Sequence, residues 1–381
     1  MLTVIACLIA TQVPIDQPPR LRTILDNGAA VMVERVPGAK NLAIQLFASS
    51  RGTEETPLTN GLRHLLEHLI AKGPKGDLDL RIETAGGFLQ AETQRDEMQF
   101  KLTLPPGQLK LGLQAVLQIM QMPVVTADDI RHEELIIAEE AAIRDDASKI
   151  STAAWTQAYG DKGMDVVGNL DVIRNATPAM LDKIHRIQFS GPNLAIVVVG
   201  DVDLDVATKA CSEILSKEPK LAVAKVDRGK AAGGGTTSTA PGEAIALPTS
   251  GWRTPQTAAR VAAAFALASE ADDCYVICTP SSSAGMVILG RSSPNTGLKT
   301  IAEKANANEL FVYGRALAKA WIKSMLTSPD RIADIRGQLL VQEVDLKPET
   351  MLENLDTMTP KNFADAIDAF RSPVAVTVAG K

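Results

Sequence analysis

The sequence predicts an α+β protein made of two related halves, each a β-sheet covered by helices, facing each other across a cleft. The second half is the shorter one. The chain has 381 residues, which is more than one ordinary hydrophobic core organises. Stretches of two-residue alternation and stretches of helical periodicity follow one another along it. Finally, a pattern in the first half returns near the C-terminus, which favours an internal duplication.

Composition places the chain among folded globular proteins. Hydrophobic residues make up 45% and charged residues 22%, so wholesale disorder is excluded. The balance of 39 Lys and Arg against 45 Asp and Glu gives a net charge of −6, which argues against a partner that is nucleic acid or an anionic membrane. Four cysteines, Cys7, Cys211, Cys274 and Cys278, form neither a CxxC pair nor a disulfide framework, which disfavours a cysteine-based metal site.

Residues 1–19 have the character of a leader segment. Met1–Val13 is uncharged and apolar, but shorter than the about 20 residues that cross a bilayer. It suits the apolar region of a signal peptide without its basic start, and Val4–Cys7 is similar to a lipoprotein cleavage box. The alternative is a first strand or an apolar tail of the mature chain. We expect an exported protein, periplasmic or otherwise extracytoplasmic, with the cytoplasm as the alternative.

Strands open the first half. Leu21–Leu25 and Ala29–Val36 flank Asp26-Asn27-Gly28, and Asn-Gly accepts positive φ at both central positions of a tight turn, so a hairpin is predicted. Asn41–Ser49 alternates between apolar and polar residues and predicts a third strand.

Helices and two more strands follow. Leu62–Lys72 predicts a helix that ends before Gly73-Pro74, and Asp77–Thr84 predicts a second, shorter one. Gly86–Leu104 predicts two strands, because its apolar residues alternate towards the end. Gln108–Met120 then has helical periodicity.

The next helix has a clear start. Thr126 and Asp129 form a capping box, in which each side chain satisfies a backbone N–H of the first turn, and the helix is expected to continue to about Asp145.

The duplication is read from two blocks of the same order. Thr177-Pro178 predicts a helix start, since Thr is a good cap and Pro is tolerated at the first helical position. Pro192 and the strand Leu194–Val199 follow it, ending at Gly200. The second block repeats this order with Thr359-Pro360, Pro373, Val374–Val378 and Gly380.

These observations divide the chain into domains. Residues 227–242 are rich in Gly, Thr and Ser, which is the composition of a flexible linker. We therefore expect a leader at 1–19, a larger domain at 20–226, a linker at 227–242 and a smaller related domain at 243–381.

The chemistry is carried by His64-Leu65-Leu66-Glu67-His68. Residues four apart share one face of a helix, so His64 and His68 can point their imidazoles at a single ion. Glu67 projects next to them and can deprotonate a water held there. This is the inverted zinc-protease arrangement, H-x-x-E-H. A catalytic zinc needs a third protein ligand, so a carboxylate from elsewhere is required.

The helix that Thr126 caps offers the candidates for this ligand, and its residues alone leave the choice open. Two of them, Glu133 and Glu140, lie two turns apart on one face. The other two histidines, His132 and His185, have no partners at ligand spacing, which is typical of surface or hydrogen-bonded core residues. The four acidic candidates are Glu133, Glu134, Glu139 and Glu140.

With these motifs the sequence resembles the pitrilysin-type family of zinc peptidases, which includes mitochondrial processing peptidase and insulin-degrading enzyme. The resemblance is strong to about residue 215 and weak afterwards. Its most specific part is the His64–His68 motif. It is supported by the stretches Leu25–Gly28, Gly61–His68, Gly86–Thr93, Ile136–Glu140 and Asn193–Asp203.

The resemblance implies a role for each matching residue. His64, His68 and Glu140 would bind one Zn²⁺ per chain, Glu67 would be the general base, and Glu133 would support the ligands. A peptide or unfolded segment would add as a strand to an edge at residues Gln90, Ala91, Glu92 and Thr93. Gln90 stands where the family usually has Asn, so an ordinary strand residue is the alternative there.

The second half departs from the family pattern. The family carries an Arg and a Tyr there that reach the substrate; Tyr275 matches the Tyr, or is a plain strand residue, and no matching Arg precedes it. A zinc endopeptidase is therefore expected to work as a homodimer or as a heterodimer with a companion subunit. The alternative is a zinc-binding scaffold subunit with weak activity, although Glu67 argues against it. No phosphate loop or similar motif supports another metal hydrolase.

Overall fold

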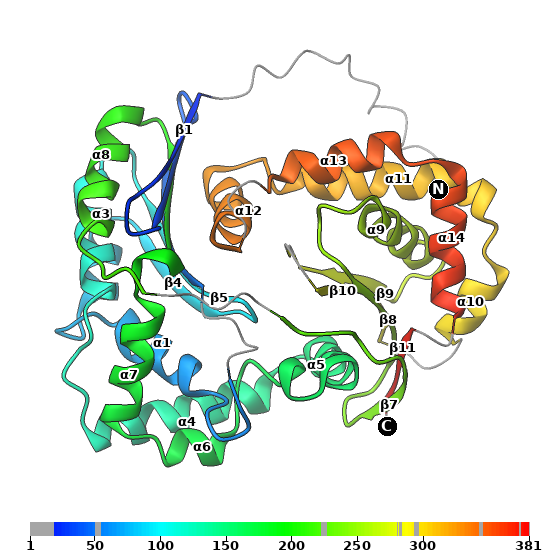
Figure 1. Cartoon of the computed structure of the whole chain (residues 1–381), viewed down its shortest axis with the longest axis horizontal. Helices are drawn as coiled ribbons and strands as arrows, with labels where there is room; N and C mark the ends of the chain where they lie inside the picture. Colours follow the sequence, from blue (N-terminus) through cyan, green and yellow to red (C-terminus); the bar gives the residue numbers. More distant parts are fainter. Residues whose placement is uncertain are drawn as a thin grey trace.

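The computed structural model describes residues 19–49, 55–221, 227–279, 281, 284–292, 297–342, 346–372 and 375–380. It contains two halves of mixed α and β structure, each built on one sheet that helices cover, so the predicted fold class is confirmed (Figure 1). The leader-like residues 1–18, with Cys7, and two residues of the final predicted block, Pro373 and Val374, lie outside the described residues. No described helix combines the length and hydropathy that crossing a membrane requires.

The first sheet has six strands in its described part, in the order β1-β2-β6-β3-β5-β4. Only β2 and β6 pair in parallel. The predicted Asn27-Gly28 turn joins β1 to β2, and Gly28 has φ 90°, which explains the need for glycine. The strands are β1 (Arg20–Ile24), β2 (Ala30–Arg35), β3 (Leu42–Ser49), β4 (Phe88–Thr93), β5 (Glu97–Leu104) and β6 (Leu194–Gly200).

The helices of the first half agree closely with the sequence pattern. Thr126 caps α4 with the predicted capping box, and α4 ends at Ile143 because Arg144 adopts an extended conformation. Asp145 then caps a separate helix, α5. The helices are α1 (Leu62–Ala71), α2 (Leu78–Thr84), α3 (Leu109–Ile119), α4 (Ala127–Ile143), α5 (Asp146–Tyr159), α6 (Leu170–Arg174), α7 (Pro178–Gln188) and α8 (Leu204–Leu215).

The second sheet repeats the first. Its described strands run in the order β7-β11-β8-β10-β9, which matches β2-β6-β3-β5-β4 position by position. In both sheets the first of these pairs is parallel and the others are antiparallel, which fits the duplication that the two Thr-Pro blocks indicate. The strands are β7 (Gly234–Ser238), β8 (Glu243–Thr249), β9 (Cys274–Cys278), β10 (Gly285–Arg291) and β11 (Val376–Gly380).

The stretch 227–242, which has linker composition, contains a strand. Gly234–Ser238 forms β7 and pairs in parallel with β11. The interpretation of this stretch as linker throughout is therefore wrong. A strand at the edge of a sheet is held by its backbone, so the small Gly and Thr side chains did not reveal it.

Helices cover the second sheet on the face opposite α5. Thr359 caps α14 with a second capping box, as the Thr-Pro signal predicts. The helices of the second half are α9 (Pro255–Ala268), α10 (Leu298–Lys304), α11 (Ala307–Ser324), α12 (Pro329–Gln342), α13 (Pro348–Thr357) and α14 (Pro360–Arg371).

The two halves exchange one helix each. α12 of the second half packs on the free face of the first sheet, where the ring of Phe47 lies so close to Gly337 that a Cβ there would be 1.9 Å away. α5 of the first half packs on the second sheet, and the Tyr159 hydroxyl donates to the Gly285 carbonyl at 3.1 Å. Figure 1 shows both helices beside the opposite half. The halves are thus interlocked by buried apolar surface.

An ion-pair network joins the same interface. The guanidinium of Arg336 on α12 contacts Glu34 of β2 at 3.0 Å and Glu349 of α13 at 2.8 and 2.9 Å. Arg20 of β1 reaches Glu349 at 3.2 Å. These charges are largely buried, so their pairing fixes α12 against the first sheet.

Candidate metal centre and active site

The H-x-x-E-H motif lies on α1, against the helix-covered face of the first sheet. The helix starts at Gly61, which has φ 100° and sits so close to Gly168 that a Cβ would be 2.9 Å from its Cα. Leu65, Leu66 and Ile70 bury the other side of α1 in the core. The helical period therefore turns His64, Glu67 and His68 away from the core and towards α4.

Three ligand atoms converge between α1 and α4. The Nε2 atoms of His64 and His68 are 3.2 Å apart, and one oxygen of Glu140 is 3.3 Å from the first and 3.5 Å from the second. Tetrahedral zinc, with bonds of about 2.0–2.2 Å, separates its ligand atoms by about 3.3–3.6 Å. The donor set therefore fits the face of a zinc tetrahedron.

Hydrogen bonds at the Nδ1 atoms of His64 and His68 leave the Nε2 atoms of both rings as acceptors. The Nδ1 atom of His64 lies 3.0 Å from the carbonyl of Val167, which can only accept, so Nδ1 carries the proton. The Nδ1 atom of His68 faces the Glu133 carboxylate at 3.2 Å. In the neutral imidazoles both Nε2 lone pairs then point at the Glu140 carboxylate, an arrangement that a cation stabilises.

Glu67 is buried beside the two histidines. His64, Glu67 and His68 each offer an atom within 4.8 Å of the others. Burial raises the pKa of Glu67, although the neighbouring histidines oppose this shift. Its Oε2 accepts a hydrogen bond of 3.2 Å from the Thr93 hydroxyl. A buried carboxyl group with a raised pKa is a candidate for proton exchange with a neighbouring water.

Glu133 contacts Nδ1 of His68, the ring nitrogen that faces away from His64. Burial alone would raise the pKa of Glu133, but hydrogen bonds from His68 and Lys72 outweigh it and lower the pKa. Contact with Glu133 in turn raises the pKa of His68, against the opposing effect of burial. Lys72, one turn beyond His68 on α1, was not among the residues that the sequence suggested; its spacing on the helix is the signal that could have revealed it.

The acidic candidates on α4 separate by position. The contact with His64 lowers the pKa of Glu140, against a smaller effect of burial. Glu139 is exposed, and Glu134 is buried and paired with Arg174 at 2.9 Å, so both face away from the histidines. His132 is exposed, while His185 bonds the Met120 carbonyl at 3.1 Å.

The four strand residues, Gln90, Ala91, Glu92 and Thr93, lie on β4. This strand is the edge of the first sheet, with β5 on its one paired side. Gln90 donates to Glu92 at 2.5 Å, and Glu92 also pairs with Lys101 at 3.2 Å. The strand thus runs past the metal-ligand group, with Thr93 touching Glu67, and its other backbone edge pairs with no strand among the described residues.

Tyr275 lies on β9 of the second sheet. Its ring covers Gly290 of β10, where a Cβ would be 2.2 Å from the ring atoms. Burial raises the pKa of Tyr275 to about 12, and Asp145 and Asp146 of the α5 start add to this. Within the described chain its hydroxyl has no hydrogen-bond partner. The structure therefore does not bring Tyr275 into the group formed by His64, Glu67, His68 and Glu140.

Comparison with known proteins identifies this arrangement. A family model described as Insulinase (Peptidase family M16) matches residues 30–160, from β2 into α5, which includes both helices of the metal-ligand group. Residues 30–160 are thus similar to an M16 peptidase domain. The resemblance to pitrilysin-type peptidases that the sequence indicates is thereby confirmed.

Relatives and a solved structure agree with this assignment. The chain is 25% identical over 190 residues to an uncharacterized zinc protease of Streptomyces coelicolor, covering 48% of this chain and 41% of that protein. It is 25% identical over 199 residues to the mitochondrial-processing peptidase subunit beta of Blastocladiella emersonii, covering 50% and 42%. The chain thus spans less than half the length of these relatives. A protease from Helicobacter pylori has the same fold, with a TM-score of 0.82, 17% identity and coverage of 96% and 100%.

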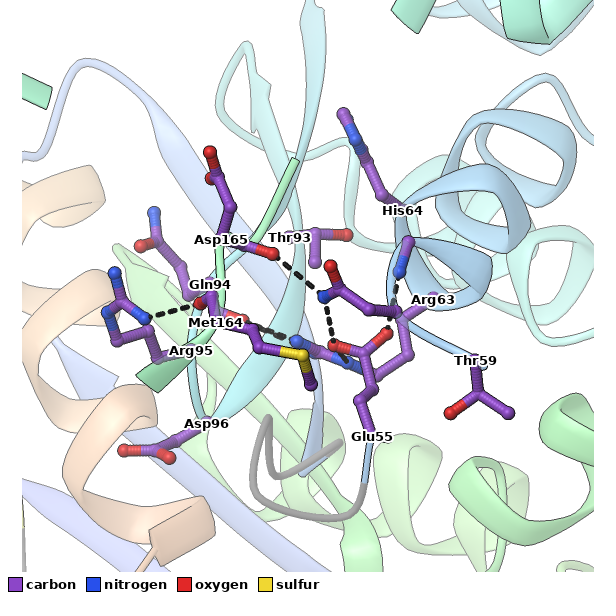
Figure 2. Close-up of polar contacts among 12 residues, drawn as sticks. Glu55, Thr59, Arg63, His64, Thr93, Gln94, Arg95, Asp96, Met164 and Asp165 are labelled. Carbon is purple, nitrogen blue, oxygen red and sulfur yellow. Dashed lines mark hydrogen bonds and ion pairs between the residues drawn. The ribbon is translucent and has the colours of Figure 1, made fainter. Parts of the chain in front are cut away.

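In this M16-like region, Arg63 ties α1 to the end of β4. Both terminal nitrogens of the buried Arg63 donate to the Gln94 carbonyl at 3.2 Å, and its Nε lies 3.3 Å from Glu55 (Figure 2). Gln94 directly follows Thr93, so this contact fixes the strand end next to Glu67. Neither Arg63 nor the Val167 carbonyl was a sequence candidate. An arginine directly before the motif gave a weak signal, and a backbone carbonyl from a distant loop gave none.

A cavity of about 260 Å³ opens between the first half and the second half. Its walls come from the β4–β5 turn, α5 and the loop at Val167 on one side, and from β9, β10 and the end of α12 on the other. Gln94 and Val167 both line it. The Val167 carbonyl contacts His64, and Gln94 follows Thr93, which contacts Glu67. The predicted cleft between the halves is therefore present beside the metal-ligand group.

Proposed function

We propose that this protein is a zinc-dependent endopeptidase that hydrolyses peptides or unfolded polypeptide segments. The observation that carries the proposal is the convergence of His64, His68 and Glu140 at the spacing of a zinc tetrahedron, with the buried carboxyl of Glu67 beside it. His64, His68 and Glu140 would hold one zinc ion per chain. When bound, zinc supplies Lewis acidity towards a peptide carbonyl and lowers the pKa of a water.

The residues around the ion divide the remaining work. Glu67 accepts the proton of the attacking water and returns it to the leaving amine. The Thr93 hydroxyl holds one oxygen of Glu67, so the other oxygen is available for this transfer. Glu133 fixes the ring of His68 with the proton on Nδ1, which keeps Nε2 as the ligand atom.

We propose that the substrate binds as an added strand on β4. The backbone edge of residues 90–93 offers hydrogen bonds to any extended peptide, which gives affinity with little demand on sequence. Thr93 connects this edge to Glu67, so a peptide paired here passes the catalytic carboxyl.

The test is hydrolysis of a quenched fluorescent peptide mixture by the zinc-loaded chain, beside Glu67→Gln and the exposed-site control His132→Gln. We expect activity in the wild type and in the control. A chelator removes the zinc chemistry, and Glu67→Gln removes the general base. Each should therefore reduce turnover by at least about a thousandfold. Full activity in Glu67→Gln would refute the assigned role.

A second candidate function is a zinc-binding subunit that turns over weakly without a companion. It is favoured by the location of Tyr275 away from the metal-ligand group and by the missing Arg before it. It also fits the name of one relative, which is a subunit of a processing peptidase. We propose that efficient turnover needs a second subunit, either another copy or a companion chain. Full activity in a strictly monomeric preparation, established by light scattering, would contradict this.

We also propose that the protein is exported, on the strength of the apolar run at its N-terminus. Fractionation of the native cells, with blotting for the chain, tests this. A signal confined to the cytoplasm would favour the alternative.

A further inference from the structure

The cavity between the halves contains a cation without a carboxylate partner. Arg95 lies in the β4–β5 turn, two residues beyond Thr93, and lines the cavity. Its Nη1 donates to the carbonyls of Gly163 and Met164, at 3.3 and 2.8 Å. Figure 2 shows Arg95 reaching towards Met164, on the side away from His64. Among the described residues no carboxylate lies within ion-pair distance of Arg95.

The other charges around the cavity compensate one another. Arg144 binds Asp165 at 2.6 Å, and Arg228 pairs with Asp96. Burial, together with the adjacent Asp96, raises the pKa of Glu97 to about 8, so this carboxyl is largely uncharged at pH 7. Arg95, Arg144 and Arg228 thus share the two carboxylates of Asp96 and Asp165, which leaves one positive charge in excess.

The surroundings hold this charge in place. The guanidinium of Arg95 stacks over Trp155 of α5, 4.5 Å from the ring centroid. Arg228 lies over the same ring at 5.1 Å, so two cations contact one aromatic ring. Burial, and then the nearby Arg228, lower the pKa of Arg95 to about 9, which still leaves it charged at neutral pH. A buried cation is costly unless an anion joins it.

The remaining walls suit an anion as well. Ser151 and Thr152 line the cavity from α5, and Gln338 lines it from α12. Ser148 and Gln342 line it too, but they already donate to Asp145 at 3.0 Å and to Glu97 at 3.3 Å. Such neutral donors add hydrogen bonds to a carboxylate without bringing a competing negative charge.

We propose that this cavity binds a carboxylate group of the peptide substrate, held by Arg95 against Trp155. The inference rests on the proposed peptidase function, because a peptide lying on β4 reaches the cavity where the strand ends at Gln94. The carboxylate is either an acidic side chain near the scissile bond or the C-terminal carboxylate of the peptide. Arg95 is thus a specificity-determining residue.

The test uses three matched fluorescent peptides with the full-length, zinc-loaded chain: one with Glu and an amidated C-terminus, one with Gln and an amidated C-terminus, and one with Gln and a free C-terminus. The Glu is moved through each position around the scissile bond. Binding is measured by anisotropy with Glu67→Gln, and hydrolysis with the wild type. We expect one carboxylate peptide to bind about tenfold or more tightly than the Gln amide, as a hydrogen bond to a charged group allows. Which peptide gains identifies the source.

Variants decide whether Arg95 is responsible. Arg95→Gln should abolish the preference, Arg95→Lys should weaken it because an ammonium lacks the planar fork, and the exposed Arg186→Gln should leave it unchanged. Equal binding of all three peptides by Glu67→Gln overturns the inference, as does a preference that survives Arg95→Gln. If Arg95→Gln does not fold, an unchanged preference in Arg95→Lys overturns it.

The two proposals fail separately. Carboxylate-selective binding without hydrolysis supports the cavity inference and refutes the peptidase function. Hydrolysis without carboxylate selectivity does the reverse.

Discussion

The two halves follow one topology but fill the space between equivalent helices differently. In the first half α1 follows β3, and the gap between α1 and α4 holds His64, His68 and Glu140. In the second half α9 follows β8, and its buried face consists mainly of alanine. Gly314 of α11 approaches α9 so closely that a Cβ would lie 2.7 Å from the Ala262 carbonyl. The comparison teaches that a metal-ligand group needs space between two helices, and that small residues close the same space by direct packing.

The largest effect is expected from removing a ligand in the first half. His68→Gln should eliminate zinc binding, measured as metal content per chain, together with the peptidase activity. In the wild type a chelator should lower the free energy of unfolding by about 4 kcal/mol if zinc is present at a thousand times its Kd. That loss should vanish in His68→Gln. The exposed His132→Gln is the matched control, and a chelator effect that persists in His68→Gln would locate the metal elsewhere.

A smaller effect is expected from filling the corresponding place in the second half. Gly314→Ala puts a methyl group against Ala262 and Ala266, and overpacking of this kind should lower the unfolding free energy by about 1–3 kcal/mol. Zinc content should remain unchanged. Urea denaturation measures the loss, with Val312→Ala, at an exposed position of the same helix, as control. Unaltered stability would show that the space between α9 and α11 accommodates an added methyl group.

The smallest effect concerns the ion pairs between the halves. Burial opposes the ionisation of Glu349, but its hydrogen bonds and charge contact with Arg336 prevail and lower its pKa to about 2. Because the folded-state pKa lies below the ordinary 4.5, the stabilisation is complete above about pH 4.5 and is lost as the pH falls towards 2. Glu349→Gln should lower the unfolding free energy by about 1–2 kcal/mol at pH 7. It should also make the unfolding free energy fall less steeply as the pH is lowered below about 4.5. The same loss of stability at low pH in the wild type and in Glu349→Gln would refute this role of Glu349.

Much of the first half could be predicted because local signals agree with the tertiary structure. Helical periodicity alone brings His64 and His68 to one face, and the Thr126 capping box marks the start of α4. The choice of Glu140 among four glutamates came from the family resemblance, since helix geometry left Glu133 equally placed. The structure brings both to the histidines, on opposite sides of the rings.

Other features leave no local trace in the sequence. The Val167 carbonyl that orients His64 is a backbone atom, so its residue type carries no signal. β7 has the composition of a linker because the backbone of β11 holds it. A helical pattern also does not specify which sheet a helix covers, so the exchange of α5 and α12 could not be foreseen.

That exchange of helices restricts how a peptide could reach α1, the helix that carries His64 and His68. Swinging the halves apart like a hinge would strip α12 from Phe47 and α5 from the second sheet, exposing two apolar sheet faces to water. For the same reason neither half is a self-sufficient folding unit: expressed alone, each would carry one bare sheet face and one orphaned helix. On the proposed function, a peptide would therefore reach the β4 edge while the two halves stay packed together.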